Sequence, residues 1–367
     1  MAEPLKYIYN ESFFNLFTNA LKQVSSSFNK KLFLEKIYDS DWESFELKQR
    51  MRHISTTLHS FLSRDYKSAV ETILELISYL KENHKGLALE FMFLPDYIEQ
   101  FGLNDFKTSI NAMEKITQYT SCEFAVRPFM IEYPNKMLST MLKWSKHEHA
   151  FVRRFASEGC RPRLPWAMAL PELKKDPTPI LPILENLKND SSEFVRKSVA
   201  NNLNDISKDN PEIVIKIAKK WKGISKNTDW IVKHGCRTLL KNGNKIVMQL
   251  FGFGDVKNIK ILDFKIHSQK VKIGDLLEFS FTLENTSNKN ELLRLEYAIY
   301  YQKANGSLSK KVFKISEKIY EKKTKSSIHR KQSFKLITTR KFHLGLHKVA
   351  LIINGTELKS YNFSLIA

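Results

Sequence analysis

Three carboxylates near the middle of the chain are candidates for chemistry, and Glu158 is the most unusual of them. Gly159 follows it and is expected to end a helix that begins near His149. A carboxylate in the last turn of a helix is disfavoured by the helix dipole by about 0.3–1 kcal/mol. Glu158 is therefore either paired with a nearby arginine or held there for a function, and the sequence leaves both interpretations open.

Asp205 and Glu123 raise the same question. Asp205 lies near the far end of a predicted helix, where it could be a surface carboxylate beside Lys208. Glu123 follows Ser121, which could cap a helix, and a carboxylate in the first turn of a helix is favourable without any function. Each of the two is either a structural carboxylate or a functional one.

Trp166 and a set of arginines accompany these carboxylates. Trp166 is either a core anchor between helices or an aromatic face at a concave surface, where it would stack on bases and attract cations. The arginines recur at or near one position of a repeated pattern, so stacking would line several of them along a surface that suits a phosphate backbone. Capping and ion pairing within each repeat are the alternative. The candidates for DNA binding are Arg127, Arg153, Arg154, Arg161, Arg163 and Arg196.

Metal, nucleotide and serine chemistry find no support in the sequence. His147 and His149 point away from each other on a helix, which argues against a metal site. The chain has no G-x-x-x-x-G-K-[ST], G-x-G-x-x-G or G-x-S-x-G motif. We therefore expect no metal and no cofactor.

The charge of the chain indicates a polyanionic partner. Its 367 residues include 59 Lys and Arg against 39 Asp and Glu, a formal charge of +20. From residue 256 to the end, 22 Lys and Arg stand against 9 Asp and Glu, a net of +13. A surplus of this size is typical of proteins that bind nucleic acid or, less often, an acidic membrane surface.

Cysteine usage and hydropathy give an expectation about the compartment. Cys122, Cys160 and Cys236 are odd in number and form no C-x-x-C, which indicates neither a disulfide framework nor a zinc cluster. No uncharged apolar stretch reaches the roughly 18 residues of a transmembrane helix, and the first residues do not resemble a signal peptide. A reducing cytoplasm is the simplest expectation.

The elements that would position these residues are helices over the first 250 residues. Segment 70–80 places apolar residues at the spacing of a helix with one buried face. A pattern of an aromatic residue followed by Val and a basic residue recurs around Val152 and Val195 and, more weakly, around Val232, with spacings of 43 and 37. A fourth copy is hinted at by residues 123–129. A period near 40 is typical of HEAT repeats, helix pairs that stack into a curved solenoid, and this part would hold about six.

The pattern changes in the last third of the chain. Short alternating segments follow, and Asn305–Gly306 and Asn354–Gly355 are strong hairpin signals. Seven or so strands in about 110 residues indicate an immunoglobulin-like β-sandwich. The basic stretch 310–341 is either a solvated sheet edge or a phosphate-contacting face. We therefore expect a mainly α chain, with a HEAT-like α-solenoid over 1–254 and a small all-β immunoglobulin-like sandwich over 255–367.

Three motifs occur in order within the helical part. They are Glu-Phe-Ala-Val-Arg-Pro-Phe at 123–129, Trp144, and Val-Arg-Arg-Phe-Ala-Ser-Glu-Gly-Cys-Arg-Pro-Arg-Leu-Pro-Trp at 152–166. Together they resemble the AlkC family of DNA alkylation-repair glycosylases, which belongs with AlkD among the HEAT-like-repeat alkylpurine glycosylases. The resemblance covers residues 1 to about 254, and the β-rich remainder resembles the immunoglobulin-like domain that some members append.

The resemblance implies an enzyme that hydrolyses the N-glycosidic bond of N3-alkylated bases, chiefly 3-methyladenine, with 3-methylcytosine as a further substrate. The family's catalytic carboxylates fall on Glu123, Glu158 and Asp205, and its active-site tryptophan falls on Trp166. Such carboxylates would stabilise an oxocarbenium-like sugar and hold the attacking water. The implied partner is double-stranded DNA with alkylated bases. We expect a monomer that has no membrane partner and acts in the bacterial cytoplasm, at the nucleoid during repair.

A non-catalytic HEAT scaffold that binds DNA or protein is the alternative. Most HEAT solenoids are scaffolds, and fold alone does not determine function. A pure scaffold has no reason to keep Glu158 at an unfavourable helix end near Trp166, which favours the enzyme. An RNA-binding repeat protein is a third possibility, but the irregular spacing of the Val-Arg positions argues against one base per repeat.

Overall fold

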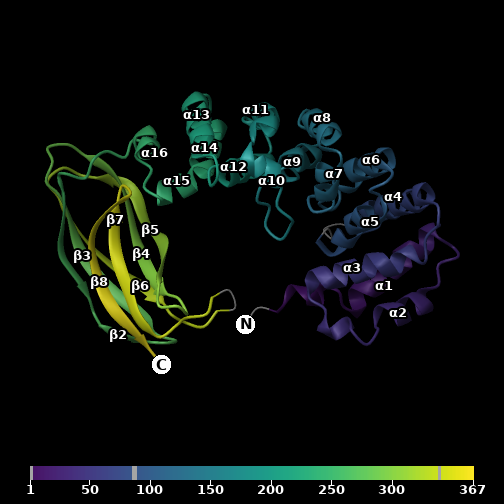
Figure 1. Ribbon diagram of the computed structural model, residues 1–367, viewed down its shortest axis with the longest axis horizontal. Helices are drawn as coiled ribbons and strands as arrows, with labels where there is room; N and C mark the ends of the chain where they lie inside the picture. The colour runs from purple at the N-terminus through teal and green to yellow at the C-terminus, as the bar shows by residue number, and fades with distance from the viewer. Residues whose placement is uncertain (1–2, 85–88, 338–339) are drawn as a thin grey trace. The chain divides into compact units, whose positions relative to one another are not determined.

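A computed structural model describes residues 3–84, 89–337 and 340–367. Its internal contacts divide the chain into two compact units, Met1–Gly235 and Cys236–Ala367. The first unit is helical and the second is dominated by β-strands (Figure 1). Within the described ranges, no helix is both long and apolar enough to cross a membrane.

The first unit contains fourteen α-helices and four short 3-10 helices within its described residues. The α-helices are α1 Glu11–Val24, α2 Lys30–Ile37, α3 Leu47–His59, α4 Tyr66–Asn83, α5 Phe93–Phe101, α6 Phe106–Ile116, α7 Val126–Glu132, α8 Pro134–Trp144, α9 Ala150–Glu158, α10 Pro171–Lys175, α11 Leu181–Leu187, α12 Glu193–Ile206, α13 Pro211–Trp221 and α14 Lys226–Gly235. The 3-10 helices are η1 Leu5–Ile8, η2 Trp42–Ser44, η3 Leu89–Met92 and η4 Thr178–Ile180.

Local sequence explains where these helices form. Helix α4 covers the predicted segment 70–80 and buries Val70 and Ile77 along one face, so that the apolar stripe drives its packing. Helix α9 begins after His149, whose Nδ1 accepts a hydrogen bond from the backbone N–H of Phe151 and so caps the helix.

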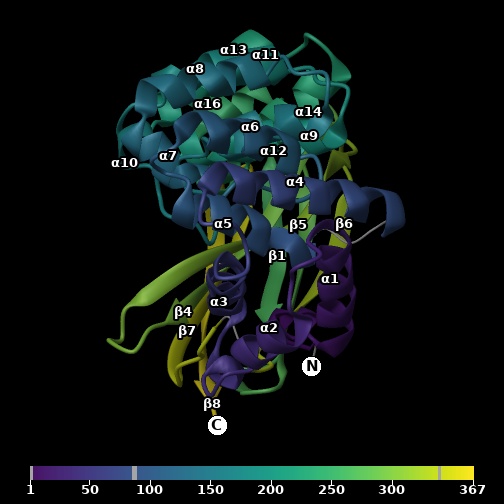
Figure 2. The ribbon, with the colours of Figure 1, turned by 90° about the vertical axis from the view of Figure 1, so that its right-hand side faces the viewer.

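The later helices of the unit pack in pairs. Helix α8 contacts α9, α11 contacts α12, and α13 contacts α14; α12 also contacts α9 and α14. Figures 1 and 2 show α8, α11 and α13 along one side of this unit and α9, α12 and α14 along the other. Neighbouring helices α9 and α12 carry two of the candidate residues, Glu158 and Asp205.

The repeated sequence pattern maps unevenly onto helix starts. Val152 and Val195 are each the third residue of their helices, α9 and α12. Val232 is the seventh residue of α14, which begins at Lys226. The third copy therefore lies one helical turn deeper in its helix than the other two.

The second unit opens with two short helices and continues as eight strands in its described part. Its elements are α15 Arg237–Lys241, α16 Lys245–Leu250, β1 Ile259–Ile266, β2 Lys270–Lys272, β3 Leu276–Asn285, β4 Glu291–Gln302, β5 Leu308–Tyr320, β6 Lys325–Ser333, β7 Gly345–Ile353 and β8 Thr356–Ile366. One sheet has the order β1-β3-β6 and the other the order β2-β8-β7-β4-β5. All pairings are antiparallel except β2 with β8.

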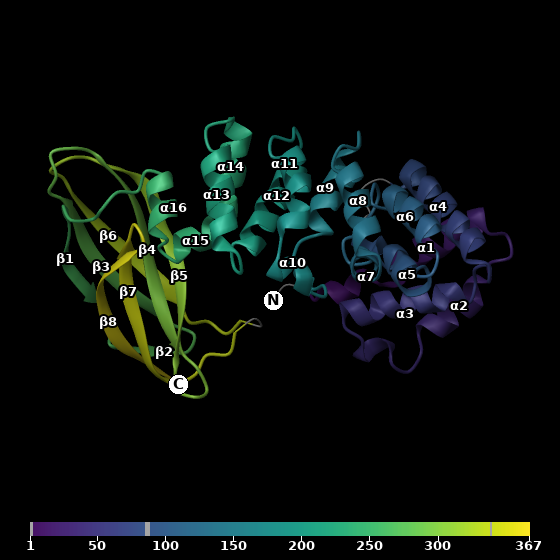
Figure 3. The same cartoon turned by 45° about the horizontal axis from the view of Figure 1, so that its top comes forward.

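A single apolar core lies between the two sheets. Phe279 and Phe281 of β3 meet residues of the other sheet, among them Leu295 of β4 and Leu351 of β7. These side chains alternate with exposed or half-buried neighbours along β3, as expected for a sheet with one face in the core. Figure 3 shows the strands of this unit as two facing layers. An all-β sandwich was predicted for this part and is confirmed.

The two Asn-Gly pairs close different loops. Asn354 and Gly355 have φ of 47° and 78° and connect β7 to β8 in a tight hairpin, as predicted. Between β4 and β5, Gly306 has a positive φ but Asn305 does not. That connection is a wider loop, in which the N–H of Lys303 donates to the carbonyl of Ser307.

The short helices α15 and α16 belong to the compact unit of the strands. The backbone of Gly243, between α15 and α16, lies against the backbone of Gly355 so closely that a Cβ on either glycine would overlap the other. Asn354 also donates a hydrogen bond to the carbonyl of Gly254. The compact units thus divide at 235, whereas the change from helix to strand occurs near residue 254, where we predicted the domain boundary.

The basic stretch 310–341 falls largely on edge strands. β5 ends the five-stranded sheet and β6 ends the three-stranded one. Lysines on edge strands discourage pairing with other chains. Residues 338 and 339 of this stretch lie outside the described residues.

Candidate active site

Six side chains of alternating charge form one connected network in the first unit. Each contacts the next at a distance of 4 Å or less, in the order Glu123, Arg154, Glu158, Arg161, Asp205 and Lys208. The network joins the turn before α7, helix α9, the loop after it and helix α12. The structure therefore brings together all three carboxylates that the sequence singled out.

Glu158 is at the centre of this network. Its Oε1 lies 2.6 Å from Nη1 of Arg161 and 3.6 Å from Nη2 of Arg154. Nε of Arg161 lies 2.8 Å from Oδ2 of Asp205. Both of these contacts of Glu158 use Oε1, and among the described residues Oε2 accepts no hydrogen bond. One oxygen of Glu158 is therefore available for a ligand or a water molecule.

Glu123 occupies the end of the network nearest α7. Its Oε2 accepts a hydrogen bond from Oγ of Ser121 at 2.7 Å and contacts Nη1 of Arg154. Arg154 in turn donates to Oγ of Ser121 at 2.6 Å. Ser121 does not cap α7, because the residue before that helix is Ala125. It instead fixes the geometry of the Glu123–Arg154 pair.

Asp205 is a buried carboxylate, not a surface one. Its side chain is 2% exposed, and Nζ of Lys208 lies 3.0 Å from its Oδ1. Arg161 contacts its other oxygen. The pairing with Lys208 that the sequence suggested is present, but the Asp205 carboxylate that it pairs with is buried.

Gly159 ends α9, as predicted, but its backbone φ is −62° and not left-handed. A Cβ at this position would lie 2.9 Å from Cγ1 of Val126 and 3.0 Å from Cε of Met141. The glycine is therefore needed for the close approach of α9 to α7 and α8. This packing sets the position of Glu158, the last residue of the helix.

Arg127 clamps the loop that follows α9. It is fully buried, and its guanidinium donates to the carbonyls of Gly159 at 3.1 Å, Arg161 at 2.6 Å and Met168 at 2.6 and 3.0 Å. Burial lowers the pKa of Arg127 to about 10, so that it stays charged at neutral pH. The predicted phosphate contact of Arg127 is wrong, because the side chain does not reach the surface and its donors serve the backbone.

Trp166 is displayed at the surface by this loop. The residue is 67% exposed, which excludes the core anchor that the sequence left open. Its φ of 63° is unusual for an aromatic residue and costs about 1–3 kcal/mol, a strain that persists only where the surroundings hold it. The carbonyl of Trp166 accepts a hydrogen bond from Nζ of Lys48 at 2.9 Å.

Arg153 and Arg196, the arginines of the repeated pattern, donate hydrogen bonds to backbone carbonyls just before the start of their own helices. Arg153 donates from Nη1 to the carbonyls of His147 and Glu148, and it pairs with Asp190. Arg196 donates from Nη1 to the carbonyls six and five residues before it, at the same offsets. The structure therefore favours the capping interpretation at these two positions.

Arg163 is the most exposed of the predicted DNA-binding arginines that form ion pairs. It makes a two-pronged pair with Asp209, at 2.7 and 2.6 Å, and its side chain is 38% exposed. Each of the six predicted arginines thus has a partner within the protein. Their contact with phosphate stays a prediction for the accessible ones.

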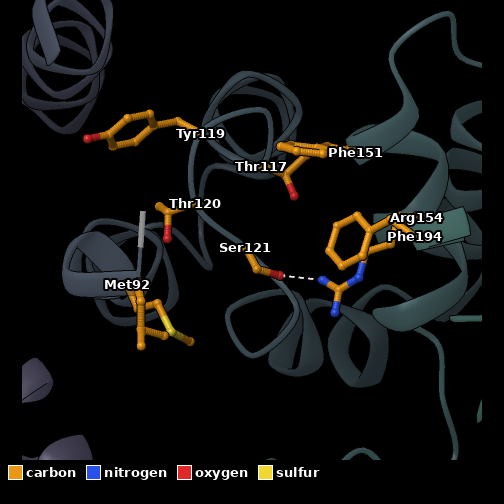
Figure 4. A pocket seen from close by; sticks show the side chains of 9 residues that line it. Met92, Thr117, Tyr119, Thr120, Ser121, Phe151, Arg154 and Phe194 are labelled. Atoms are coloured by element: carbon orange, nitrogen blue, oxygen red, sulfur yellow. Dashed lines mark hydrogen bonds between the residues drawn. The ribbon is translucent and has the colours of Figure 1, made fainter. Parts of the chain in front are cut away.

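A pocket of about 290 Å³ lies beside Arg154 (Figure 4). Its lining is mostly apolar and includes Phe151 and Phe194, whose rings are 5.5 Å apart at 72°. The guanidinium carbon of Arg154 lies 4.8 Å from the ring centroid of Phe194, and Figure 4 shows its hydrogen bond to Ser121 across the pocket. Sequence reasoning did not identify this pocket, although both phenylalanines precede a Val-Arg pair.

The sequence also provided no indication of Lys48, which lies near the candidate site. It lies on α3, 118 residues before Trp166, and no local pattern connects the two. Within the described part of the chain, no group of three or more His, Cys, Asp and Glu side chains could hold a metal ion.

Comparisons with known proteins give the family. Residues 47–239 match the model of the DNA alkylation repair enzyme family, and residues 260–367 match the C-terminal Ig-like domain of uncharacterised protein YhaZ. The uncharacterized protein YhaZ of Bacillus subtilis is 43% identical over 361 residues, which cover 98% of this chain and 99% of that protein.

A solved structure is similar over the full length. It is the Pseudomonas fluorescens alkylpurine DNA glycosylase AlkC bound to DNA containing an abasic site analogue, with a TM-score of 0.93, 36% identity and complete coverage of both chains. The family match begins at residue 47 of the helical unit and includes the charged network, and the Ig-like match covers the strands. The chain belongs to the DNA alkylation repair enzyme family, is of the AlkC type and ends in an Ig-like domain.

Proposed function

We propose that the protein is a DNA glycosylase that hydrolyses the N-glycosidic bond of N3-alkylated bases in double-stranded DNA. The observation that carries this proposal is the charge of the buried network. Three carboxylates, Glu123, Glu158 and Asp205, have side chains 2–15% exposed and share two arginines that are equally buried. The third cation, Lys208, is 40% exposed. The buried members of the network therefore carry one excess negative charge among themselves, while the nearby Arg127, whose charge also acts on Asp205 and Glu123, gives its hydrogen bonds to loop carbonyls.

This excess charge suits the reaction. As the bond between base and sugar breaks, the deoxyribose becomes oxocarbenium-like and gains positive charge. A fixed carboxylate in a partly desolvated site stabilises that charge without reorganisation. Glu158 is the proposed principal group, since its Oε2 accepts no hydrogen bond among the described residues and its position is fixed by Arg161 and Arg154.

Water must then reach the sugar as the nucleophile. A carboxylate oxygen that is not taken by an arginine accepts a hydrogen bond from that water and orients it. In this proposal Asp205 and Glu123 act on Glu158 through the arginines and keep the network ionised. The alkylated base leaves with the electron pair of the glycosidic bond, which neutralises its positive charge.

The substrate class follows from the leaving group. A 3-methylated adenine or cytosine is already cationic in DNA, so it needs no strong general acid. The site matches this requirement, because every carboxylate of the network is paired with a cation and none is surrounded only by apolar groups. Trp166 would offer its exposed face to the cationic base or to the sugar.

The proposal extends to the repeat architecture of the first unit and to the partner and compartment of the protein. We infer that the paired helices of the first unit are HEAT-like repeats, because α9 and α12 share the repeated pattern and the capping arginine. We propose that the protein acts as a monomer on alkylated double-stranded DNA in the bacterial cytoplasm. The AlkC relative was solved with DNA, which supports a DNA partner for this chain.

Release of free base tests the activity. Purified protein in excess is incubated with DNA methylated by dimethyl sulfate, and the supernatant is analysed for 3-methyladenine, 3-methylcytosine and 7-methylguanine. We expect 3-methyladenine and 3-methylcytosine to appear in the supernatant, and the amount of 7-methylguanine released shows whether the site distinguishes among cationic bases. If the DNA is bound but no methylated base is released, the protein is a scaffold of the non-catalytic kind.

A further inference from the structure

Helix α3 approaches the candidate site through one side chain. Lys48 is its second residue, and its Nζ donates to the backbone carbonyl of Trp166 at 2.9 Å. The same Nζ lies 5.1 Å from the ring centroid of Phe124, in the turn that carries Glu123. One lysine thus contacts the Trp166 loop and borders the turn of a candidate carboxylate.

The position of Lys48 is fixed by its own helix. A capping box between Glu46 and Gln49 holds the first turn of α3. One turn later on the same helix, Arg52 pairs with Asp96 at 3.0 Å and with Glu99 at 2.7 Å, which ties α3 to α5. The capping box and the Arg52 ion pairs therefore fix the part of α3 that carries Lys48.

A buried carboxylate, Asp96, and a half-buried one, Glu99, lie near the lysine on α5. Lys48 lines a small cavity together with Asp96, Glu99 and Ser121. Burial raises the pKa of Asp96 and of Glu99, and the charges of Arg52 and Lys48 oppose this rise. The two carboxylates therefore attract the ammonium group of Lys48.

Trp166 needs a support of this kind. Its φ of 63° places the peptide between Trp166 and Ala167 in an orientation that aromatic residues rarely adopt. Arg127 holds the loop at Gly159, Arg161 and Met168, on both sides of the tryptophan but not at its own peptide group. In that peptide group, the N–H of Ala167 donates to the carbonyl of Leu164 at 3.3 Å and closes a turn, and the bond from Lys48 fixes the carbonyl of Trp166.

We propose that Lys48 is a positioning residue that holds the Trp166 peptide in its left-handed conformation and so aims the indole ring. Its catalytic consequence rests on the proposed glycosylase function. Without the bond, this peptide group keeps the 3.3 Å turn bond from Ala167 to Leu164 but loses its anchor on α3, and Trp166 relaxes toward an ordinary φ, which turns the ring away from its present direction. A reacting group misplaced by about 1 Å can cost 100-fold in rate.

A double-mutant cycle tests the proposal on single-turnover excision of 3-methyladenine by the full-length protein. We expect Lys48→Met to slow excision about 10- to 100-fold. Lys48→Arg, which keeps a cationic donor, should recover most of the rate. In a Trp166→Ala background, Lys48→Met should cause no further loss, because no ring is left to aim. A Lys48→Met rate within twofold of the parent, or an effect that multiplies with Trp166→Ala, would overturn the proposal.

Fluorescence tests the same link without catalysis. The contribution of Trp166 is obtained as the difference between each protein and its Trp166→Phe counterpart, and its quenching by neutral acrylamide is measured. We expect Lys48→Met to change this quenching. Lys136→Met is the control, because Lys136 is likewise an exposed lysine over aromatic rings, those of Phe106 and Tyr133, but it stands on another helix, α8.

The excision rate and the Trp166 quenching together distinguish a failure of the proposed function from a failure of the positioning role. If the parent protein releases no base, the proposed function fails, and the fluorescence result alone decides whether Lys48 positions Trp166. If excision occurs but Trp166 quenching is unchanged in Lys48→Met, the positioning role is wrong. Equal changes in Lys48→Met and Lys136→Met would overturn it as well.

Discussion

Glu158 is the residue on which the proposed chemistry depends most, and Glu158→Gln removes its charge while keeping its shape. The buried network then loses its excess negative charge, so we expect single-turnover excision to fall about 10²–10³-fold. Arg161 keeps Asp205 and Arg154 keeps Glu123 as partners, which limits the stability loss to roughly 1–3 kcal/mol. Excision and a thermal melt are measured on the same samples.

A matched control separates charge from stability. Glu185 also binds two cations, Lys188 and Lys220, and accepts from the indole of Trp221. Glu185→Gln should lower the melting temperature without slowing excision. If the excision rate of Glu158→Gln is within threefold of the parent rate, Glu158 has no part in the mechanism. If its melting temperature falls sharply together with the rate, the role of Glu158 is structural.

Arg127 shows that an arginine in a repeated pattern can serve the structure of a loop where a phosphate contact was predicted. Its place in a repeated pattern suggested a phosphate contact, yet the structure gives its donors to three loop carbonyls. Arg127→Met should leave these buried carbonyls unsatisfied, at about 1–3 kcal/mol each. Urea unfolding should therefore show a large loss of stability.

The control for this prediction is Arg163→Met. Arg163 pairs with Asp209 near the surface, where a salt bridge is worth about 0–1 kcal/mol. A variant Arg127→Met that unfolds like the parent but binds DNA more weakly would restore the phosphate role.

At the scale of elements, the end of α9 is positioned by close packing. Gly159→Ala would raise helix propensity, and φ is already helical. The added Cβ, however, would press on Val126 and Met141. We expect a net destabilisation of about 1–3 kcal/mol from overpacking. Gly254→Ala is the control, since its Cβ would meet nothing within 4 Å, and a more stable Gly159→Ala would contradict the packing argument.

Elements with a local signal could be predicted, and elements held by distant contacts could not. The stripe of α4 and the Asn354–Gly355 hairpin follow from periodicity and turn chemistry within a few residues. The left-handed φ of Trp166 has only part of such a signal. Pro165 suits the turn that the N–H of Ala167 closes onto Leu164, but neither Gly nor Asn stands at 166, and Lys48, which binds the carbonyl of Trp166, comes from α3. Family resemblance named Trp166, but only the structure shows how it is held.

The candidate carboxylates illustrate the same limit. Glu158 and Asp205 lie 47 positions apart and meet because α9 packs on α12, which the repeat pattern predicted in outline. The sequence did not predict that arginines would join them into one network. Charge pairing at this range depends on side-chain geometry that no spacing rule encodes.

At the scale of the whole molecule, the domain boundary is open to a direct test. We propose that α15 and α16 fold with the strands, because Gly243 packs on Gly355 and Gly254 accepts a bond from Asn354. A fragment of residues 236–367 should then melt at a higher temperature than a fragment of residues 255–367. Equal melts would favour the boundary at 254 that the sequence suggested.

The distribution of charge between the two units leads to the last prediction. Residues 1–235 contain 34 Lys and Arg against 29 Asp and Glu, and residues 236–367 contain 25 against 10, net charges of +5 and +15. Each phosphate neutralised by a lysine or arginine releases counterions, so log Kd changes with log salt concentration by about 0.9 per contact. If the second unit contacts DNA, the full chain should show a steeper slope than residues 1–235, by roughly 3 for three added contacts. Fluorescence anisotropy on one undamaged duplex at several salt concentrations measures both slopes. Equal slopes would mean that the positive charge of the strands does not face DNA and instead serves, as on β5 and β6, to keep sheet edges from pairing.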